Sequence, residues 1–370
     1  MRLVSILAIL TLGLVGCQPI DPPPGPVSFR VEEVKSGLGG ALWSINFAPD
    51  GRLLFTNRDL GQIRVSALNL STGAVTHFNG TSAVRDEGEG GILGMELDPS
   101  FAGNNRVYVC YSVWLNGNRR NRLSRFEISG SSLTNELILL DNMLGASNHN
   151  GCRVVWGPDG KLYVSMGDAA VESTAQDLSA LAGKIFRINP DGSIPTDNPF
   201  FNQTTGSARA TWVLGLRNSQ GLAFQPGTGL LWSTEHGPAV KDELNVIKRG
   251  RNYGWPTCMG TDPCPSVTNY QPAIKQYTAS DTIAPSDMMF YTGNVFTGWR
   301  NNLFFVTLRT GRLYRLVLNG ESVAQEEILI DNSSGPNPGF GRLRDIATGP
   351  DGLIYISTDS GRILRLVPQN

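Results

Sequence analysis

Residues 154–168 read VVWGPDGKLYVSMGD, which is a short apolar strand, a Pro-Asp-Gly turn and a second apolar strand. Pro158 presets φ for the turn and Gly160 supplies the positive φ that follows, so the two strands are predicted to form a β-hairpin. The second strand alternates its side chains with a period of two, as a sheet requires. The stretch therefore predicts antiparallel β-structure.

The same phrase returns along the chain. Its other copies are INFAPDGRLLFTN at 45–57, MELDPSFAGNNRVYVCYS at 95–112, LAFQPGTGLLWSTEHG at 222–237, a weaker VFTGWRNNLFFVTL at 295–308, and IATGPDGLIYISTD at 346–359. Spacings of about 50 to 75 residues suit four-stranded blades with variable insertions. We therefore predict an all-β fold, a six-bladed β-propeller with four-stranded antiparallel blades over residues 28–370. A β-sandwich would not repeat one turn phrase six times, and a β-helix would repeat at a shorter period.

The first residues predict export. A positively charged start precedes an uncharged apolar run over 3–15, which fits the apolar region of a secretory signal. The run ends before Cys17 with the spacing of a lipoprotein signal peptidase site, so we interpret 1–16 as a lipoprotein signal peptide and 17–27 as a Pro-rich tether. We expect an exported bacterial lipoprotein on the periplasmic or cell-surface side, anchored only by lipid on Cys17, in the outer membrane if the cell is Gram-negative. An ordinary signal peptide with a chance cysteine is the alternative.

The net charge argues against a nucleic-acid-binding protein, and the cysteines suggest disulfide bonds. The chain has 31 Lys and Arg against 32 Asp and Glu, a net charge of −1, whereas nucleic-acid binding needs clustered positive charge. Four cysteines follow Cys17. Export favours a disulfide between two of them, Cys258 and Cys264, which flank a Gly/Pro loop. Cys110 and Cys152 are either a second bridge or buried thiols.

Two side chains at one hairpin predict acid–base chemistry. His149 and Asp168 lie at the start and the end of the third repeat, where an imidazole and a carboxylate could meet. A carboxylate that accepts from Nδ1–H fixes the tautomer and raises the basicity of Nε2, as a general base requires. A structural histidine is the alternative.

Two further segments carry polar groups that a turn does not need. Arg217 and Asn218 lie between glycines. Residues 235–256 combine carboxylates, amides and loop carbonyls, which suit an oxygen-seeking cation such as calcium. A solvated acidic loop is the alternative for the second segment.

Two arginines near the C-terminus form the last polar group. Arg342 and Arg344 point to the same side of a predicted strand. Paired arginines bind carboxylates bidentately. Otherwise they are surface charges paired to Asp345.

Together these segments resemble the soluble aldose sugar dehydrogenases that depend on pyrroloquinoline quinone (PQQ), within the wider glucose/sorbosone dehydrogenase group. The resemblance runs from about Gly37 to Pro368 and is most specific over 149–256. The matching stretches there are HNGCRVVWGPDGKLYVSMGD, AQDLSALAGKIFRINPDGSIPTDNPF, GLRNSQGLAF and EHGPAVKDELNVIKRGRNYGWP. The resemblance implies an enzyme that uses PQQ and calcium to oxidise aldoses at C1 to the lactone.

The resemblance also implies roles for single residues. His149 would take the proton of the anomeric hydroxyl, and Asp168 would orient it. The residues at cofactor-contacting positions are Glu89, Arg217, Asn218, Arg309, Arg342 and Arg344. Those at calcium positions are Gly237 and Pro238, through their backbone carbonyls, and Glu243 and Tyr253 for a second calcium.

Two positions depart from the family pattern. Glu89 stands where the best-studied members have a glutamine that contacts the cofactor, and a carboxylate donates a hydrogen bond only when it is protonated. Arg309 stands where a lysine is usual, which keeps the charge and changes its reach.

Two other functions stay open. A non-catalytic calcium-binding propeller that binds sugar or protein would have the same fold, since fold does not imply function. A calcium-dependent lactonase would need several side-chain carboxylates and amides around one central metal, and no repeat supplies them. The chain has no haem-binding Cys-x-x-Cys-His motif, so the dehydrogenase would pass its electrons to a soluble or membrane acceptor, whose identity is unknown.

Overall fold

A computed structural model describes residues 28–278, 282–332 and 339–369. The predicted signal peptide at 1–16 and the tether at 17–27 lie outside this part of the chain. Within the described ranges, no helix has both the length and the apolar character needed to cross a membrane.

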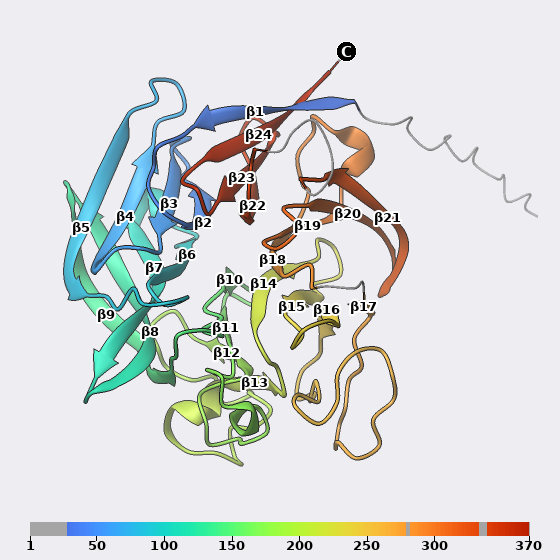
Figure 1. Ribbon diagram of the computed structural model, residues 1–370. Coiled ribbons are helices and arrows are strands. Elements are labelled where there is room, and N and C mark those ends of the chain that lie inside the picture. Colours follow the sequence, from blue (N-terminus) through green and yellow to red (C-terminus); the bar gives the residue numbers. More distant parts are fainter. Residues whose placement is uncertain (1–27, 279–281, 333–338, 370) are drawn as a thin grey trace, which may run out of the picture.

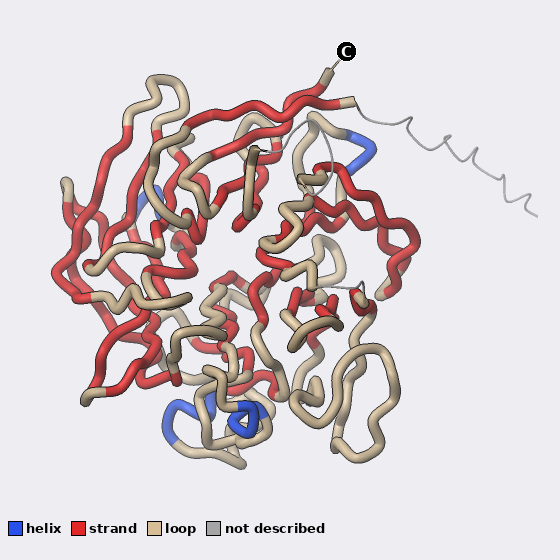
Figure 2. The backbone as a smooth tube through the Cα atoms, in the orientation of Figure 1, coloured by secondary structure: helices blue, strands red, loops and turns tan. Residues whose placement is uncertain are grey.

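Strands make up most of the described fold (Figure 2). One four-stranded sheet has the order β1 (Phe29–Lys35), β24 (Ile363–Pro368), β23 (Ile354–Thr358) and β22 (Leu343–Thr348). The next has β10 (Val154–Trp156), β11 (Leu162–Met166), β12 (Lys184–Ile188) and β13 (Thr211–Leu214). Another has β14 (Ser219–Phe224), β15 (Leu231–Glu235), β16 (Asp242–Ile247) and β17 (Lys275–Tyr277). A further one has β18 (Pro285–Phe290), β19 (Leu303–Thr307), β20 (Leu313–Asn319) and β21 (Ser322–Ile330).

The remaining strands form one eight-stranded sheet. Its order is β2 (Leu42–Phe47), β3 (Leu53–Asn57), β4 (Gln62–Leu68), β5 (Val75–Ala83), β9 (Ser132–Leu144), β8 (Asn118–Ser129), β7 (Arg106–Leu115) and β6 (Ile92–Leu97). A single parallel residue pair, Asn79 with Ser132, joins its two four-stranded halves. The helices are short: α1 (Phe101–Asn104) and the 3₁₀ helices η1 (Glu172–Ala175), η2 (Gly206–Ala210) and η3 (Thr297–Trp299).

The sheets stand in a ring, with β2, β6, β10, β14, β18 and β22 toward the middle and β1 on the outside (Figure 1). These inner strands pack against one another in chain order, and β22 packs against β2 to close the ring. The N-terminal strand β1 pairs antiparallel with β24, from Phe29 opposite Pro368 onward. The two ends of the chain thereby complete one sheet, and the architecture is that of a β-propeller.

The turn chemistry read from the sequence is present in the hairpin of β10 and β11. Gly160 has a φ of 69°, and Asp159 Oδ1 accepts from the backbone N–H of Lys161 at 3.2 Å. Tyr163 on β11 donates its hydroxyl proton to the other oxygen of Asp159 at 3.1 Å. The side chains of β11 are all buried, as expected for a strand between two packed neighbours.

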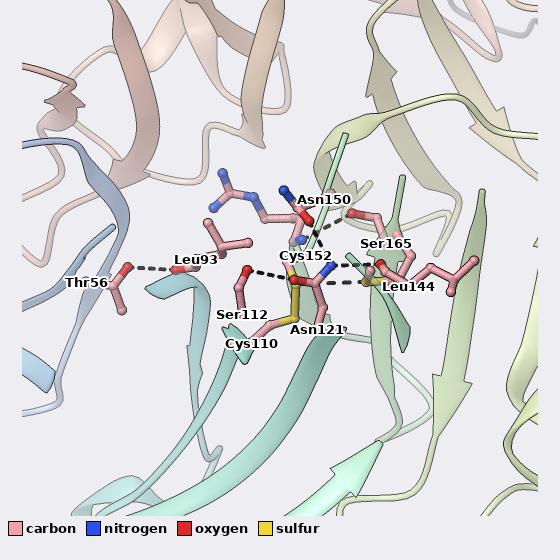
Figure 3. Close-up of a disulfide and its surroundings, with 12 residues drawn as sticks. Thr56, Leu93, Cys110, Ser112, Asn121, Leu144, Asn150, Cys152 and Ser165 are labelled. Atoms are coloured by element: carbon pink, nitrogen blue, oxygen red, sulfur yellow. Dashed lines mark hydrogen bonds between the residues drawn. A yellow bond between two sulfur atoms is a disulfide. The ribbon is translucent and has the colours of Figure 1, made fainter. Parts of the chain in front are cut away.

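Both cysteine pairs are disulfides. Cys258 is bonded to Cys264 within one loop, as the sequence favours. Cys110 on β7 is bonded to Cys152, just before β10 (Figure 3). This second bridge resolves the alternative that the sequence left open, because the segment before β10 packs against β7 and brings the two cysteines within bonding distance.

A buried charge cluster lies where the inner strands converge. Arg153 Nη1 is 2.7 Å from Asp345 on β22, and its Nε is 3.0 Å from Asp287 on β18. The same guanidinium lies 4.2 Å from the ring centroid of Trp43 on β2. The cluster ties three inner strands to the chain segment that leads into β10.

Glu96 on β6 borders this cluster and predicts a pH dependence of stability. Burial, with a smaller contribution from the charge of Asp345, raises the pKa of Glu96 from 4.5 to about 8. The folded state therefore holds a proton that the unfolded chain loses, and folding stability falls as the pH rises from 4.5 through about 8. We expect Glu96→Gln to raise Tm more at pH 9 than at pH 5 in thermal melts. An equal change at both pH values would contradict this assignment.

Candidate active site

His149 and Asp168 meet as the hairpin predicted. His149 Nδ1 lies 2.8 Å from Asp168 Oδ1, and Asp168 is completely buried. The second carboxylate oxygen accepts from Trp255 Nε1 at 2.8 Å, and Oδ1 also accepts from the backbone N–H of Ala170 at 2.8 Å. Because a carboxylate only accepts, the neutral imidazole carries its proton on Nδ1 and presents Nε2 as a base.

The backbone of His149 is held in an unusual conformation. Its φ is 57°, and its N–H donates to Glu89 Oε2 at 2.9 Å. The N–H of Glu89 in turn donates to the carbonyl of Ser147 at 2.7 Å. A Cβ at Gly167 would collide with the carbonyl of His149, so the last turn of the hairpin needs glycine there. Glu89 is thus a structural partner of the histidine as well as a member of the predicted cofactor set.

A cavity lies beside this pair, on the side of the neighbouring residues Asn150 and Gly151. It is lined by Trp43, Arg58, Glu89, Asn150, Gly151, Gln220, His236, Leu308, Arg342 and Arg344. A wider cavity is lined by residues of the inner strands β2, β6, β10, β14, β18 and β22. Trp43 and Arg58 were not singled out from the sequence, since Trp43 lies in an apolar strand and the polar residues 57–59 follow a strand as an ordinary turn would.

The two C-terminal arginines face this cavity and share one carboxylate. Arg342 Nε lies 2.7 Å from Asp359 Oδ2, and Arg344 Nε lies 2.7 Å from Asp359 Oδ1. Although burial opposes ionisation, the charge of Arg344, followed by that of Arg342, holds the pKa of Asp359 below its usual value. The alternative that they pair with Asp345 is wrong, because Asp345 points inward and binds Arg153.

Arg309 stands apart from this group. It is exposed after β19, and its N–H donates to the carbonyl of Ile283 at 3.2 Å. Its neighbour Leu308 lines the cavity, whereas Arg309 is not among the lining residues.

Arg217 and Asn218 place unused polar groups at the channel. Arg217 Nη1 donates to the carbonyl of His236 at 3.2 Å, and its guanidinium lies over Trp255. Asn218 Oδ1 accepts from the N–H of Gly151 at 3.2 Å. The buried atoms Arg217 Nε, Asn218 Nδ2 and Gln220 Oε1 have no protein partner. A buried polar atom without a partner costs about 1–3 kcal/mol, so these groups fit a polar ligand better than an empty channel.

A second pocket adjoins the first and shares His236 with it. Two buried carboxylates, Glu235 and Glu243, lie along it. Asn245 Nδ2 donates to both, at 3.3 Å and 3.1 Å. Burial, and then the charge of Glu243, raises the pKa of Glu235 well above its ordinary value. Such a pair gains by neutralisation, through protons or through a cation.

The residues predicted for calcium gather at this second pocket. Its lining includes Gly237, Pro238, Glu243 and Tyr253. The phenol of Tyr253 donates to the carbonyl of Val246 at 2.6 Å and accepts from an N–H, so its side-chain oxygen is already used. Within the described ranges, no three His, Cys, Asp or Glu side chains form a group able to hold a metal. A cation in this pocket would therefore need backbone carbonyls among its ligands.

Sequence comparison places the chain among sugar dehydrogenases. The sequence pattern described as Glucose / Sorbosone dehydrogenase matches residues 40–365. An aldose sugar dehydrogenase of Escherichia coli (strain K12) is 32% identical, with 93% of this chain and 94% of the relative covered. Quinoprotein glucose dehydrogenase B of Acinetobacter calcoaceticus is 27% identical, with 97% and 92% covered.

Comparison with solved structures agrees with the sequence comparison. The PQQ-bound form of the aldose sugar dehydrogenase from Streptomyces coelicolor superposes with a TM-score of 0.78 at 29% identity, covering 94% of this chain and all of that one. The sequence match and the superposition both span nearly the whole described ring. The chain therefore belongs to the glucose/sorbosone dehydrogenase family of oxidoreductases.

Proposed function

We propose that this protein oxidises aldose sugars at C1 to the lactone, with PQQ and calcium as cofactors and His149 as the general base. The observation that carries the proposal is the His149–Asp168 pair beside a cavity bordered by Arg342 and Arg344. Arginine side chains suit a cofactor with three carboxylates, and the PQQ-bound relative supports this choice of cofactor.

The chain's own part in the reaction is to bind, orient and accept a proton. His149 Nε2 would take the proton of the anomeric hydroxyl, while Asp168 holds the imidazole tautomer and stabilises the imidazolium that forms. When bound, PQQ would supply the acceptor for the hydride that leaves sugar C1. Arg217, Arg342 and Arg344 would bind its carboxylates, and the amide of Asn218 has an unpartnered N–H to donate.

Calcium would bind at the second pocket. The backbone carbonyls of Gly237 and Pro238 are the proposed ligands beside the cofactor, and Glu243 with the backbone carbonyl of Tyr253 are those of a second ion. The two buried carboxylates along this pocket support a cation there, because burial and their mutual repulsion make a bound positive charge favourable.

The number of propeller blades and the cellular location of the protein are part of the same proposal. We infer six blades by counting the halves of the eight-stranded sheet separately, since only one residue pair joins them. Export through residues 1–16 and a lipid on Cys17 would hold the enzyme at a membrane, where it would pass electrons to an acceptor not yet known.

Reconstitution tests the proposal. Purified protein without residues 1–16, and with Cys17 replaced by serine, would be stripped of metal, mixed with PQQ and calcium, and given glucose and a dye acceptor. Dye reduction that requires both additions is the expected result. If PQQ neither binds nor supports turnover with a panel of aldoses, the dehydrogenase proposal fails, and a sugar- or protein-binding propeller takes its place. Turnover of a lactone with calcium alone would instead establish a hydrolase.

Glu89 offers a directed gain of function. Glu89→Gln keeps an oxygen for the His149 N–H and adds an amide donor toward the cavity. The hydrogen bond from the His149 N–H becomes a neutral one instead of a charge-assisted one. Because an oxygen acceptor stays in place, the loop that carries His149 should change little. We expect PQQ to bind on the order of 10-fold more tightly, as one added hydrogen bond of about 1.4 kcal/mol would give. Isothermal titration calorimetry against wild type measures it, and weaker binding by the variant would contradict the assigned position.

A further inference from the structure

In the loop that carries His149, two residues with a Cβ, His149 and Cys152, hold a backbone conformation that such residues do not favour. His149, Gly151 and Cys152 have φ values of 57°, 61° and 72°. The left-handed region is unfavourable for residues with a Cβ, and such residues stay there only where their surroundings over-determine the conformation. Something outside the loop must therefore hold it.

One external restraint is covalent. Cys152 is bonded to Cys110 on β7, which belongs to a different sheet, and the two Cα atoms are 5.7 Å apart (Figure 3). Both cysteines are completely buried. A Cβ at Gly94 on β6 would collide with the carbonyl of Cys152, so the loop end is also packed tightly against the neighbouring sheet.

A second restraint comes from the same face of the same strand. Ser112 lies two residues beyond Cys110, so both side chains point to one side of β7. Ser112 Oγ donates to Asn121 Oδ1 at 2.7 Å, and Asn121 Nδ2 donates to Asn150 Oδ1 at 3.1 Å (Figure 3). The side chains of Ser112, Asn121 and Asn150, which form this hydrogen-bond chain, are all buried. Strand β7 thus holds residues on both sides of Gly151.

The opposite side of the loop is fastened to the hairpin that ends at Asp168. The N–H of Cys152 donates to the carbonyl of Ser165 on β11 at 2.6 Å. A third contact is separate from this hairpin: the N–H of Gly151 donates to Asn218 Oδ1, just before β14, at 3.2 Å. The loop is therefore clamped between β7 and β11, and the spacing of these two strands sets where the imidazole meets the carboxylate.

We propose that the Cys110–Cys152 disulfide and the Ser112–Asn121–Asn150 hydrogen-bond chain form a brace that positions the His149 imidazole against Asp168. This inference rests on the proposed role of His149 as base. Both parts are needed: the disulfide fixes the Cα–Cα separation at Cys152 within narrow limits, and the hydrogen-bond chain fixes Asn150 on the other side of Gly151. Cys110 and Cys152 are positioning residues that act through His149.

A purely stabilising disulfide would behave differently. It would restrict the unfolded chain and leave the folded site unchanged. A brace predicts a local change at His149 in protein that is still folded. The readout must therefore report on the imidazole itself, with and without the cofactor.

The experiment compares Cys110→Ala/Cys152→Ala with wild type. In ¹⁵N-histidine-labelled protein free of PQQ, well below the unfolding temperature, the Nδ1–H proton of His149 should give a low-field NMR signal, assigned by its absence in His149→Ala. We expect the double variant to lose or shift this signal. The Nε2–H of His236, which lies 2.8 Å from the carbonyl of Pro285, should stay in place as an internal reference.

A matched control separates geometry from stability. Leu366→Ala removes a buried side chain from β24, which lowers stability without touching the loop, and should leave the His149 signal unchanged. In protein loaded with PQQ and calcium, the double variant should lose on the order of 10- to 100-fold in kcat with little change in KM, as misplacement of a catalytic group gives.

Each outcome decides the inference. An unchanged His149 signal in a folded double variant overturns it, whatever the activity. A lost signal in protein whose wild type never turns over sugar supports the brace and rejects the proposed function instead. If the double variant does not fold, Ser112→Ala tests the same brace with the disulfide intact. A shifted His149 signal in that variant supports the brace, and an unshifted one overturns it.

Discussion

His149→Ala is expected to lower PQQ-dependent dye reduction on the order of 100- to 10,000-fold, because general-base catalysis contributes about that much. The imidazole is the one group in the cavity region that combines a buried carboxylate partner with an available basic nitrogen. PQQ and calcium should still bind, since the arginines and the second pocket are unchanged. Steady-state kinetics with glucose, together with calorimetric titration of PQQ, separate the two effects.

The matched control is His77→Ala. His77 lies exposed on the outer strand β5, where its Nδ1 meets Ser66 Oγ at 2.9 Å. Its replacement should leave kcat and KM within twofold or so of wild type, since nothing of it reaches the channel. Retention of nearly full activity in His149→Ala would remove the histidine from the mechanism, and Glu235 would become the next base to test.

Arg153→Met is expected to destabilise the fold by about 3–5 kcal/mol, the cost of leaving buried carboxylates without their cation. The guanidinium binds Asp345 at 2.7 Å and Asp287 at 3.0 Å, and all three side chains are buried. Methionine keeps most of the length and removes the charge. Burial, despite the charge of Arg153, already raises the pKa of Asp287 well above its ordinary value, so loss of the arginine leaves both acids with a larger penalty.

Urea unfolding at pH 7 measures this effect, with Arg52→Met as the control. Arg52 pairs with Asp50 at 2.7 Å on the surface, and exposed pairs contribute about 0–1 kcal/mol. Adding Asp345→Asn and Asp287→Asn to Arg153→Met should recover part of the loss, because the uncompensated charge disappears with the carboxylates. If Arg153→Met unfolds at the same urea concentration as Arg52→Met, the cluster does not hold the ring together.

Much of the fold was predictable because its signals are local. The Pro-Asp-Gly turn at 158–160 constrains φ within three residues, and the hairpin of β10 and β11 follows from it. Its repetition predicted a ring of similar sheets. Nothing local predicted that β1 would pair with β24, since that contact joins the two ends of the described chain and exists only when the ring closes.

The contacts of the candidate site also fall into those that the sequence predicted and those that it did not. His149 and Asp168 were predictable as neighbours, because an antiparallel hairpin brings its own two ends together. The bond to Asp168 comes from Trp255, in the loop between β16 and β17, and no sequence spacing signals it. The hydrogen bond from His149 to Glu89 likewise depends on how two loops meet.

The pairing of charges and of cysteines shows why contacts between distant segments could not be predicted from the sequence. Arg342 and Arg344 bind Asp359, whereas Asp345 binds Arg153 from another sheet. Residue types and their spacing specify turns, strand faces and the chemistry on offer, because those depend on backbone torsions over a few residues. Which carboxylate meets which arginine, and that Cys110 bonds Cys152, depend on the packing of inner strands around the ring, where residues far apart in sequence become neighbours.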